Sequence, residues 1–214
     1  MHEVRNPARV AALSAWQSEV GRLAMKRTRS FNEDYPAPPQ GLTPDDCKAI
    51  GFEFHDARSA YNFLDGAGKS TVRIDFSPGL RHRAVSVQGP EEWAGALLWV
   101  DAEPVPVPRD ADGNPLCEKY AQWLDERFVY ARIGGLWDHP LLDPGVIDRL
   151  GNLRGLLIWD VLRHERHIEL PTPRELWTSP LVSLRDNSLR IHSDGEAFKQ
   201  NRADRVLPIV IGGG

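Results

Sequence analysis

Hydrophobic residues recur at intervals of three and four near the start of the chain, which is the spacing of one face of an α-helix. Because Pro7 suits a first helical turn, the pattern predicts an amphipathic helix over residues 8–29. A proline-rich segment, residues 30–43, follows and favours an extended connector. We expect residues 1–29, which contain this helix, to form an arm, or an element docked on the rest of the same chain. Its apolar stripe consists of Leu13, Trp16, Val20 and Leu23.

Strict alternation of apolar and polar residues predicts strands in two other regions. Residues 72–76 and 85–88 alternate on either side of a Ser-Pro-Gly turn and favour a β-hairpin. Residues 182–184 and 189–191 alternate around an Asp-Asn-Ser turn, and residues 206–211 resemble a final strand.

Helix-start signals and helical spacing predict further helices between these hairpins. Helices and hairpins in separate runs indicate an α+β fold, with antiparallel hairpins packed against several short-to-medium helices. We expect residues 44–214 to form one such domain. The additional helices are expected to begin at Pro44 and Asp143 and to cover residues 56–64, 89–100, 115–133 and 153–167.

Bulk composition indicates an ordinary globular protein. The chain has 214 residues, of which 41% are hydrophobic and 26% charged. Two cysteines do not make a disulfide scaffold, no secretory signal is visible, and no apolar stretch approaches the ~20 residues that span a bilayer. We therefore expect a cytoplasmic protein without membrane contact.

Charge is segregated along the chain. Arginine outnumbers lysine 21 to 5, although the formal net charge is −4. Residues 1–30 carry six cations and two carboxylates, whereas residues 91–126 carry nine carboxylates and two cations. Arginine grips carboxylate or phosphate with a planar fork, so its clusters favour an anionic partner. A GC-rich genome also produces an arginine excess, and a solvated surface explains any single cluster.

Three basic clusters are candidate binding sites. If they converge in space, they fit a nucleic-acid backbone or an acidic protein surface. The oligomeric state stays open. The candidates are Arg22, Lys26, Arg27 and Arg29 on the first helix, Arg81 and Arg83 after a hairpin turn, and Arg163 and Arg166 further on.

A second hypothesis is a metal site. If residues 153–167 are helical, Asp160, His164 and His167 lie on one face, where they could share a divalent metal ion. Such a metal would activate water in a hydrolase. The structural alternative is a buried Asp160 that accepts a hydrogen bond from His164.

No strong catalytic motif is present. Gly66-Ala67-Gly68-Lys69-Ser70-Thr71 ends like a phosphate-binding loop but lacks the first glycine and is predicted to lie between a helix and a strand, the reverse of that motif. The sequence thus favours a non-catalytic protein that works within an assembly, without a cofactor. A metal-dependent hydrolase is the alternative.

Overall fold

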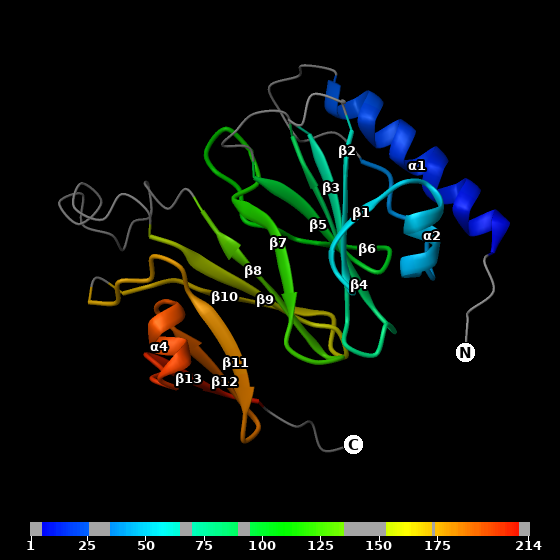
Figure 1. Cartoon of the computed structure of the whole chain (residues 1–214). Coiled ribbons are helices and arrows are strands. Elements are labelled where there is room, and N and C mark those ends of the chain that lie inside the picture. The colour runs from blue at the N-terminus through cyan, green and yellow to red at the C-terminus, as the bar shows by residue number, and fades with distance from the viewer. Residues whose placement is uncertain are drawn as a thin grey trace.

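The chain folds into stacked antiparallel sheets with few helices (Figure 1). The computed structural model describes residues 6–25, 35–64, 70–89, 95–134, 153–172 and 174–209. Within these ranges it contains thirteen strands in three sheets and three helices. The predicted α+β fold with several helices is therefore wrong, because most of the expected helices are strands. Among the described residues, no helix is long and apolar enough to cross a membrane.

Each sheet is built from consecutive strands. The helices are α1 (Pro7–Met25), α2 (Pro44–Ala49) and α4 (Gly195–Lys199). The six-stranded sheet contains β1 (Glu53–Asp56), β2 (Ser59–Phe63), β3 (Thr71–Phe76), β4 (Arg83–Gln88), β5 (Ala96–Val100) and β6 (Glu103–Val105). The four-stranded sheet has the order β10 (Glu165–Glu169), β9 (Gly155–Asp160), β8 (Phe128–Ile133) and β7 (Cys117–Trp123). The three-stranded sheet contains β11 (Leu181–Arg185), β12 (Ser188–His192) and β13 (Arg205–Pro208).

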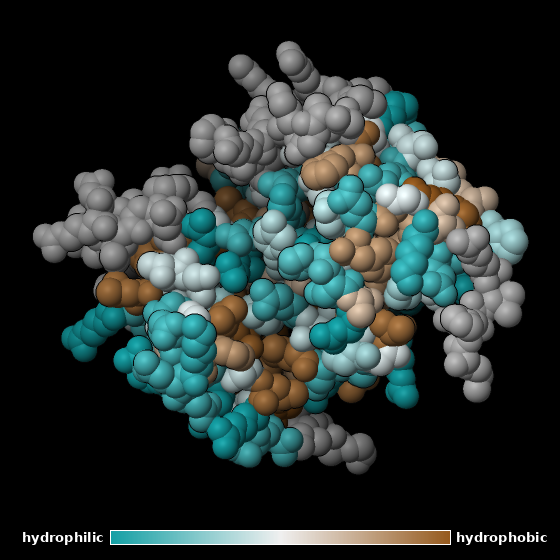
Figure 2. Space-filling model, in the orientation of Figure 1, coloured by the Kyte–Doolittle hydropathy of each residue, from teal (hydrophilic) through white to brown (hydrophobic). Residues whose placement is uncertain are grey.

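Three hydrophobic clusters join these elements into layers. The first lies between α1, α2 and one face of the six-stranded sheet, and it includes Leu13 and Ile74. The second lies between the other face of that sheet and the four-stranded sheet. The third lies between the four-stranded and three-stranded sheets, around Trp177. Figure 1 shows this succession from α1 to the three-stranded sheet, while the surface in view in Figure 2 is mainly hydrophilic.

Strand β9 is buried on both faces. Leu157 and Trp159 face the six-stranded sheet, and Leu156 and Ile158 face the three-stranded sheet. All six residues of β9 are buried. A strand covered on both sides has a continuous apolar sequence, which periodicity cannot distinguish from a buried helix. This is why the predicted helix over residues 153–167 is wrong.

Two of the other incorrect helices have a common cause, which is a turn without glycine or proline. In the predicted helix over residues 115–133, Asp125 Oδ1 accepts hydrogen bonds from the backbone N–H of Arg127 (2.8 Å) and Phe128 (2.7 Å) and closes the turn between β7 and β8. Asp56 accepts a similar bond from Arg58 N–H (2.7 Å) between β1 and β2. These aspartates start turns, not helices. Residues 95–100 contain β5, and the helix expected at Asp143 lies outside the described residues.

Both predicted hairpins are confirmed. β3 pairs with β4 and β11 with β12, and β13 follows as the predicted final strand. Asp186 and Asn187 both have positive φ, at 50° and 53°, as a tight hairpin turn requires. Helix α2 is also confirmed, with Thr43 and Asp46 forming a reciprocal capping box.

Helix α1 begins as predicted and packs on the chain through its apolar stripe. Leu13 and Val20 are fully buried, and Trp16 Nε1 donates a hydrogen bond to Pro36 O (2.8 Å). Arg9 Nε lies 3.0 Å from the buried Asp46 carboxylate. The boundary at residues 30–43 stays a prediction, since only residues 35–43 of that segment are described.

A substitution in the stripe tests whether α1 belongs to the core. We expect Leu13→Ala to lower the free energy of unfolding by about 2–5 kcal/mol, because it removes fully buried carbon atoms and leaves a cavity. The exposed Ser14→Ala is the control and should change it by less than about 0.5 kcal/mol. Urea unfolding measures both. Equal stabilities for the two variants would mean that α1 does not stabilise the fold.

Candidate functional site

Hairpin turns of the six-stranded and four-stranded sheets gather at one end of the stacked sheets (Figure 1), which we call the turn end, and side-chain contacts link four of them. They are the β3–β4 turn (residues 77–82), the β5–β6 turn (residues 101–102), the β7–β8 turn (residues 124–127) and the β9–β10 turn (residues 161–164). Side-chain contacts connect each turn, or the strand end beside it, to two others. The contacts close a ring that spans the six-stranded and four-stranded sheets.

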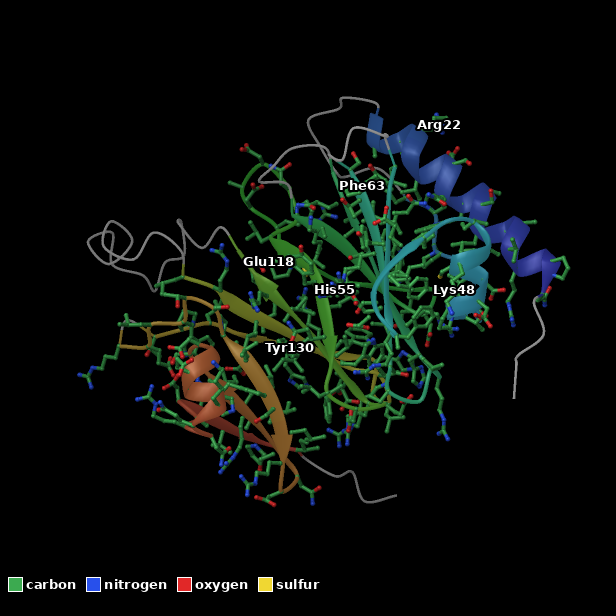
Figure 3. The ribbon with its side chains drawn as sticks, in the orientation of Figure 1. Arg22, Lys48, His55, Phe63, Glu118 and Tyr130 are labelled. Atoms are coloured by element: carbon green, nitrogen blue, oxygen red, sulfur yellow. The ribbon has the colours of Figure 1, made fainter. Side chains whose placement is uncertain are left out.

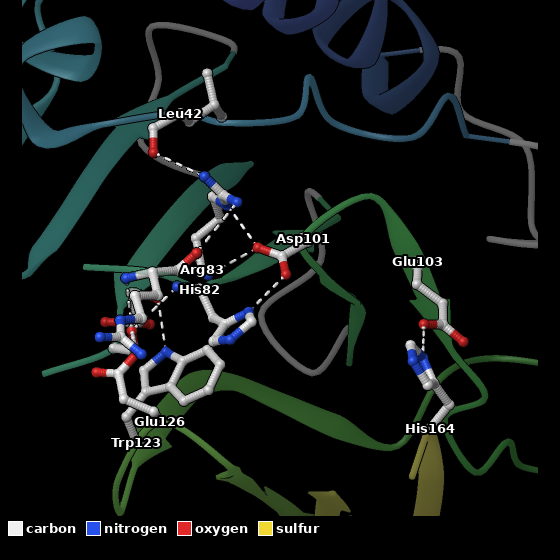
Figure 4. Close-up of polar contacts among 11 residues, drawn as sticks. Leu42, His82, Arg83, Asp101, Glu103, Trp123, Glu126 and His164 are labelled. Carbon is white, nitrogen blue, oxygen red and sulfur yellow. Dashed lines mark hydrogen bonds and ion pairs between the residues drawn. The ribbon is translucent and has the colours of Figure 1, made fainter. Parts of the chain in front are cut away.

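Two carboxylates hold the β3–β4 turn. Glu126, from the β7–β8 turn, accepts hydrogen bonds from Ser77 Oγ (2.7 Å) and from Gly79 N–H. Slight burial raises the pKa of Glu126, but these bonds outweigh it and hold the pKa below its ordinary value. On the other side, Asp101 lies 2.6 Å from Arg83 Nε and 2.9 Å from His82 Nδ1 (Figure 4).

The β9–β10 turn closes the ring. Arg127 approaches both carboxylate oxygens of Asp160, at 2.6 to 3.0 Å. Burial raises the pKa of Asp160, but the hydrogen bonds and positive charge of Arg127 hold it below its ordinary value. Asp160 Oδ1 also accepts from Leu162 N–H, at 3.1 Å, and so shapes its own turn. His164 Nδ1 contacts Glu103 at the start of β6 (Figure 4).

Trp123 links the six-stranded and four-stranded sheets beside the ring. Its indole Nε1 donates to Asp75 O (2.8 Å), and its ring stacks against His82 with centroids 6.1 Å apart. Arg83 reaches in the other direction and donates to Leu42 O (3.0 Å). The β3–β4 turn is therefore held from three directions, which limits its freedom to move.

Two leucines protrude from this fixed framework. Leu80 is 47% exposed and Leu162 is 70% exposed, and each is followed by an exposed arginine, Arg81 or Arg163. Leu80 also has φ of 59°, in the left-handed region that bulky side chains rarely adopt and that costs about 1–3 kcal/mol. Strain of this kind in an exposed apolar residue points to a role other than stability.

A pocket of about 300 Å³ lies next to the ring. Val100, Trp159 and Val161 contribute apolar surface, and Glu103 and His164 lie at it. Among the described residues, no group of three or more His, Cys, Asp or Glu is placed to hold a metal ion.

The proposed metal ligands are not arranged as predicted. Asp160 is paired with Arg127 and His164 with Glu103, while His167 lies in β10 opposite Ile158. Because residues 155–160 and 165–169 are strands, the shared helical face does not exist. The structure thus removes the geometry on which the metal hypothesis depended.

Members of two of the three basic clusters lie at the turn end. Arg81 and Arg163 are exposed there, and Arg166 is exposed in β10 with its guanidinium bonded to Pro106 O. Arg83, however, is buried in its contact with Asp101. Arg22 is paired with Glu19 at the other end of the molecule (Figure 3). The remaining candidates, Lys26, Arg27 and Arg29, lie outside the described residues.

Sequence reasoning missed most residues of the ring. Asp101 and Glu126 belong to the acidic segment 91–126, whose role was open; Asp101 pairs with Arg83 and His82, and Glu126 accepts hydrogen bonds from Ser77 and Gly79. Arg127 and Trp123 were assigned to a helix. Asp160 is the one ring residue whose type gave a usable signal, because aspartate commonly starts a turn by accepting backbone N–H groups.

Comparison with protein-family models, curated proteins and solved structures found no match for this chain. The candidate site therefore rests on its own geometry.

Removing Arg127 tests the link between the β7–β8 and β9–β10 turns. Arg127→Gln leaves the buried Asp160 carboxylate without its cation, and we expect it to lower the free energy of unfolding by about 2–4 kcal/mol at pH 7. The cost is moderated because Arg127 keeps some contact with water. Arg185→Gln, in an exposed pair with Asp186, is the control and should cost less than about 1 kcal/mol.

The loss of stability caused by Arg127→Gln should depend on pH in a defined direction. Since the folded-state pKa of Asp160 is lowered, the stabilisation is fully present above the ordinary aspartate pKa and is lost as pH falls through the folded value. The difference between wild type and Arg127→Gln should therefore shrink as pH falls from 7 to below about 4. Urea unfolding across this range measures it, and a difference that stays constant would contradict the assignment.

Proposed function

We propose that the protein is a non-catalytic interaction protein that binds an acidic surface of a partner protein through the turn end. One observation carries the proposal: Leu80–Arg81 and Leu162–Arg163 project from turns of two different sheets that the ring joins. Each pair offers an apolar anchor beside a guanidinium. The proposal keeps the cytoplasmic location expected from the sequence, and the buried Cys47 and Cys117 are not in a disulfide.

The energetics of such a contact favour a protein partner. Complete burial of a fully exposed leucine side chain contributes about 1.5–3 kcal/mol, and Leu162 and Leu80, at 70% and 47% exposed, retain a large part of that gain for a specific interface. The adjacent arginines add bidentate bonds to carboxylates and select for charge. Because the ring already fixes the turns, little conformational entropy is lost on binding.

A nucleic-acid backbone fits the same end less well. Asp101, Glu103 and Glu126 lie among the basic residues and would repel a chain of phosphates. The leucines gain nothing from phosphate contact, and the net charge of the chain is −4. A partner protein can place its carboxylates opposite the exposed arginines alone, and it also provides apolar groups that bury the leucines, which a phosphate backbone lacks.

The test compares two double variants with a control at the other end of the molecule. Leu80→Ser with Leu162→Ser removes the anchors, and Arg81→Glu with Arg163→Glu reverses the charges. Arg22→Glu reverses a single charge on α1 as the control. Immobilised wild type captures partners from an extract of the source organism, mass spectrometry identifies them, and titration with the purified partner gives affinities.

We expect each double variant to bind at least ~10-fold more weakly than wild type, and Arg22→Glu to bind normally. Circular dichroism controls for folding, since all four positions are exposed. Unchanged affinity in both double variants would contradict the proposal. Capture that disappears after nuclease treatment would replace the protein partner with a nucleic acid.

A further inference from the structure

The edges of the three sheets differ in how well they are protected. An edge strand presents unpaired backbone N–H and C=O groups, and proteins usually block it with proline, a bulge or a cover. Among the described residues, three sheets give six edge strands, and five of them are blocked. The edge strands are β1, β6, β7, β10, β11 and β13.

Each of the five has an identifiable obstacle. β1 and β7 have register irregularities in their pairing. β6 has only three residues, one of them Pro104, and β13 ends at Pro208. β11 is partly buried and lies in contact with α4. None of these edges accepts another strand easily.

β10 has none of these obstacles. Its five residues pair with β9 in an unbroken register, from Glu165 opposite Asp160 to Glu169 opposite Leu156. It contains no proline or glycine, and Glu165, Arg166, His167 and Ile168 are all exposed. β10 also continues directly from the protruding Leu162–Arg163 pair. A regular, exposed edge thus leads away from the turn end.

We propose that β10 is the docking edge for the partner, which adds an extended segment as a fifth strand of the four-stranded sheet and places carboxylates opposite Arg166 and Arg163. The inference rests on the proposed function and specifies how the partner binds. Backbone bonds to the open edge supply affinity, and alternate side chains supply specificity. The Leu162–Arg163 pair contacts the same segment beyond the end of the strand.

A second copy of this chain is a poor occupant. Opposite residues of antiparallel strands share a face, so a two-fold pair of β10 strands is centred on one residue. Centring it on Glu165 or Arg166 places that charge opposite its copy, and centring it on His167 places Glu165 opposite Glu169. Centring it on Ile168 brings the proline two residues beyond β10 into the ladder, where it offers no N–H.

The side chains of β10 define a pattern for the partner. Arg166 and Ile168 lie on the face toward the six-stranded sheet, since they pair with Trp159 and Leu157. A carboxylate opposite Arg166 and an apolar residue opposite Ile168 match this face. An antiparallel partner strand therefore has, from its N-terminal side, an apolar residue opposite Ile168, then any residue, then an acidic residue opposite Arg166. A second acidic residue follows three positions later, near Arg163.

A designed peptide tests the mode of binding. The probe is a ten-residue peptide with Val, Glu and Asp at the positions that face Ile168, Arg166 and Arg163. A second peptide has the same sequence but N-methyl groups on the alternate amides that face β10. It keeps every side chain and charge, but it loses the backbone donors that would face β10 and places methyl groups against that edge, so it cannot pair as a strand. Titration against the full chain by NMR gives both affinities, and hydrogen exchange reports on the amides of β10.

We expect the N-methylated peptide to bind at least about tenfold more weakly, because it forms fewer backbone hydrogen bonds. The unmodified peptide should slow exchange of β10 amides, and Arg166→Glu should weaken it by about tenfold. Arg185→Glu, an exposed position on β11, should have no effect. Equal binding of the two peptides, or no binding at millimolar concentration, would overturn strand addition.

Failure of this inference is distinguishable from failure of the proposed function. Equal binding of the two peptides, together with partner capture that still depends on the Leu80 and Leu162 anchors, leaves the function intact and rejects β10 as the docking edge. If peptide binding depends on the backbone amides but partner capture does not depend on the Leu80 and Leu162 anchors, β10 is retained as the docking edge and the turn end is rejected as the binding surface. Concentration-dependent dimerisation that Arg166→Glu abolishes would replace the partner with a second copy.

Discussion

Burial of both faces of the four-stranded sheet is the constraint on which the rest of the structure depends. One face requires the six-stranded sheet and the other requires the three-stranded sheet, so three sheets must stack. β9, with all its residues buried, lies at the centre of this stack. Since the sheets are antiparallel meanders, stacking brings four of their hairpin turns to one end. The turn end and its ring are consequences of how the apolar residues are buried.

The turn end is where residues of the acidic and basic segments of the sequence come together. Two carboxylates from the acidic segment, Asp101 and Glu103, contact residues of the basic clusters, and Glu126 holds the turn that precedes Arg81. These contacts neutralise part of the positive charge, and Arg83 is buried in its contact with Asp101. The side chains that project from the ring are fewer than the sequence clusters suggested. In each of the two pairs, Leu80–Arg81 and Leu162–Arg163, an exposed arginine follows an exposed leucine. A mixed apolar and cationic surface suits a protein partner better than a uniformly basic one suits nucleic acid.

Sequence predicted the parts of the fold where local signals agree with tertiary structure. The β3–β4 and β11–β12 hairpins alternate in polarity and have recognisable turns, and α2 has its capping box. Sequence failed at β9, where burial on both faces removes the alternation, and at turns that depend on aspartate in place of glycine. For the site, the clusters around Arg81 and Arg163 were identified, but their meeting was not. Contacts such as Glu126 with Ser77 join residues 49 positions apart, and no local pattern encodes them.

The central claim is that the ring holds the Leu80–Arg81 and Leu162–Arg163 pairs in one fixed arrangement. Pulsed electron paramagnetic resonance with spin labels at positions 81 and 163 measures this directly, because the width of the distance distribution reports how rigidly the two turns are held. The account predicts one narrow distribution in the intact ring and a broad one after Asp101→Ala with Glu126→Ala. A distribution that is already broad in the intact ring, or one that does not change when those carboxylates are removed, would contradict it.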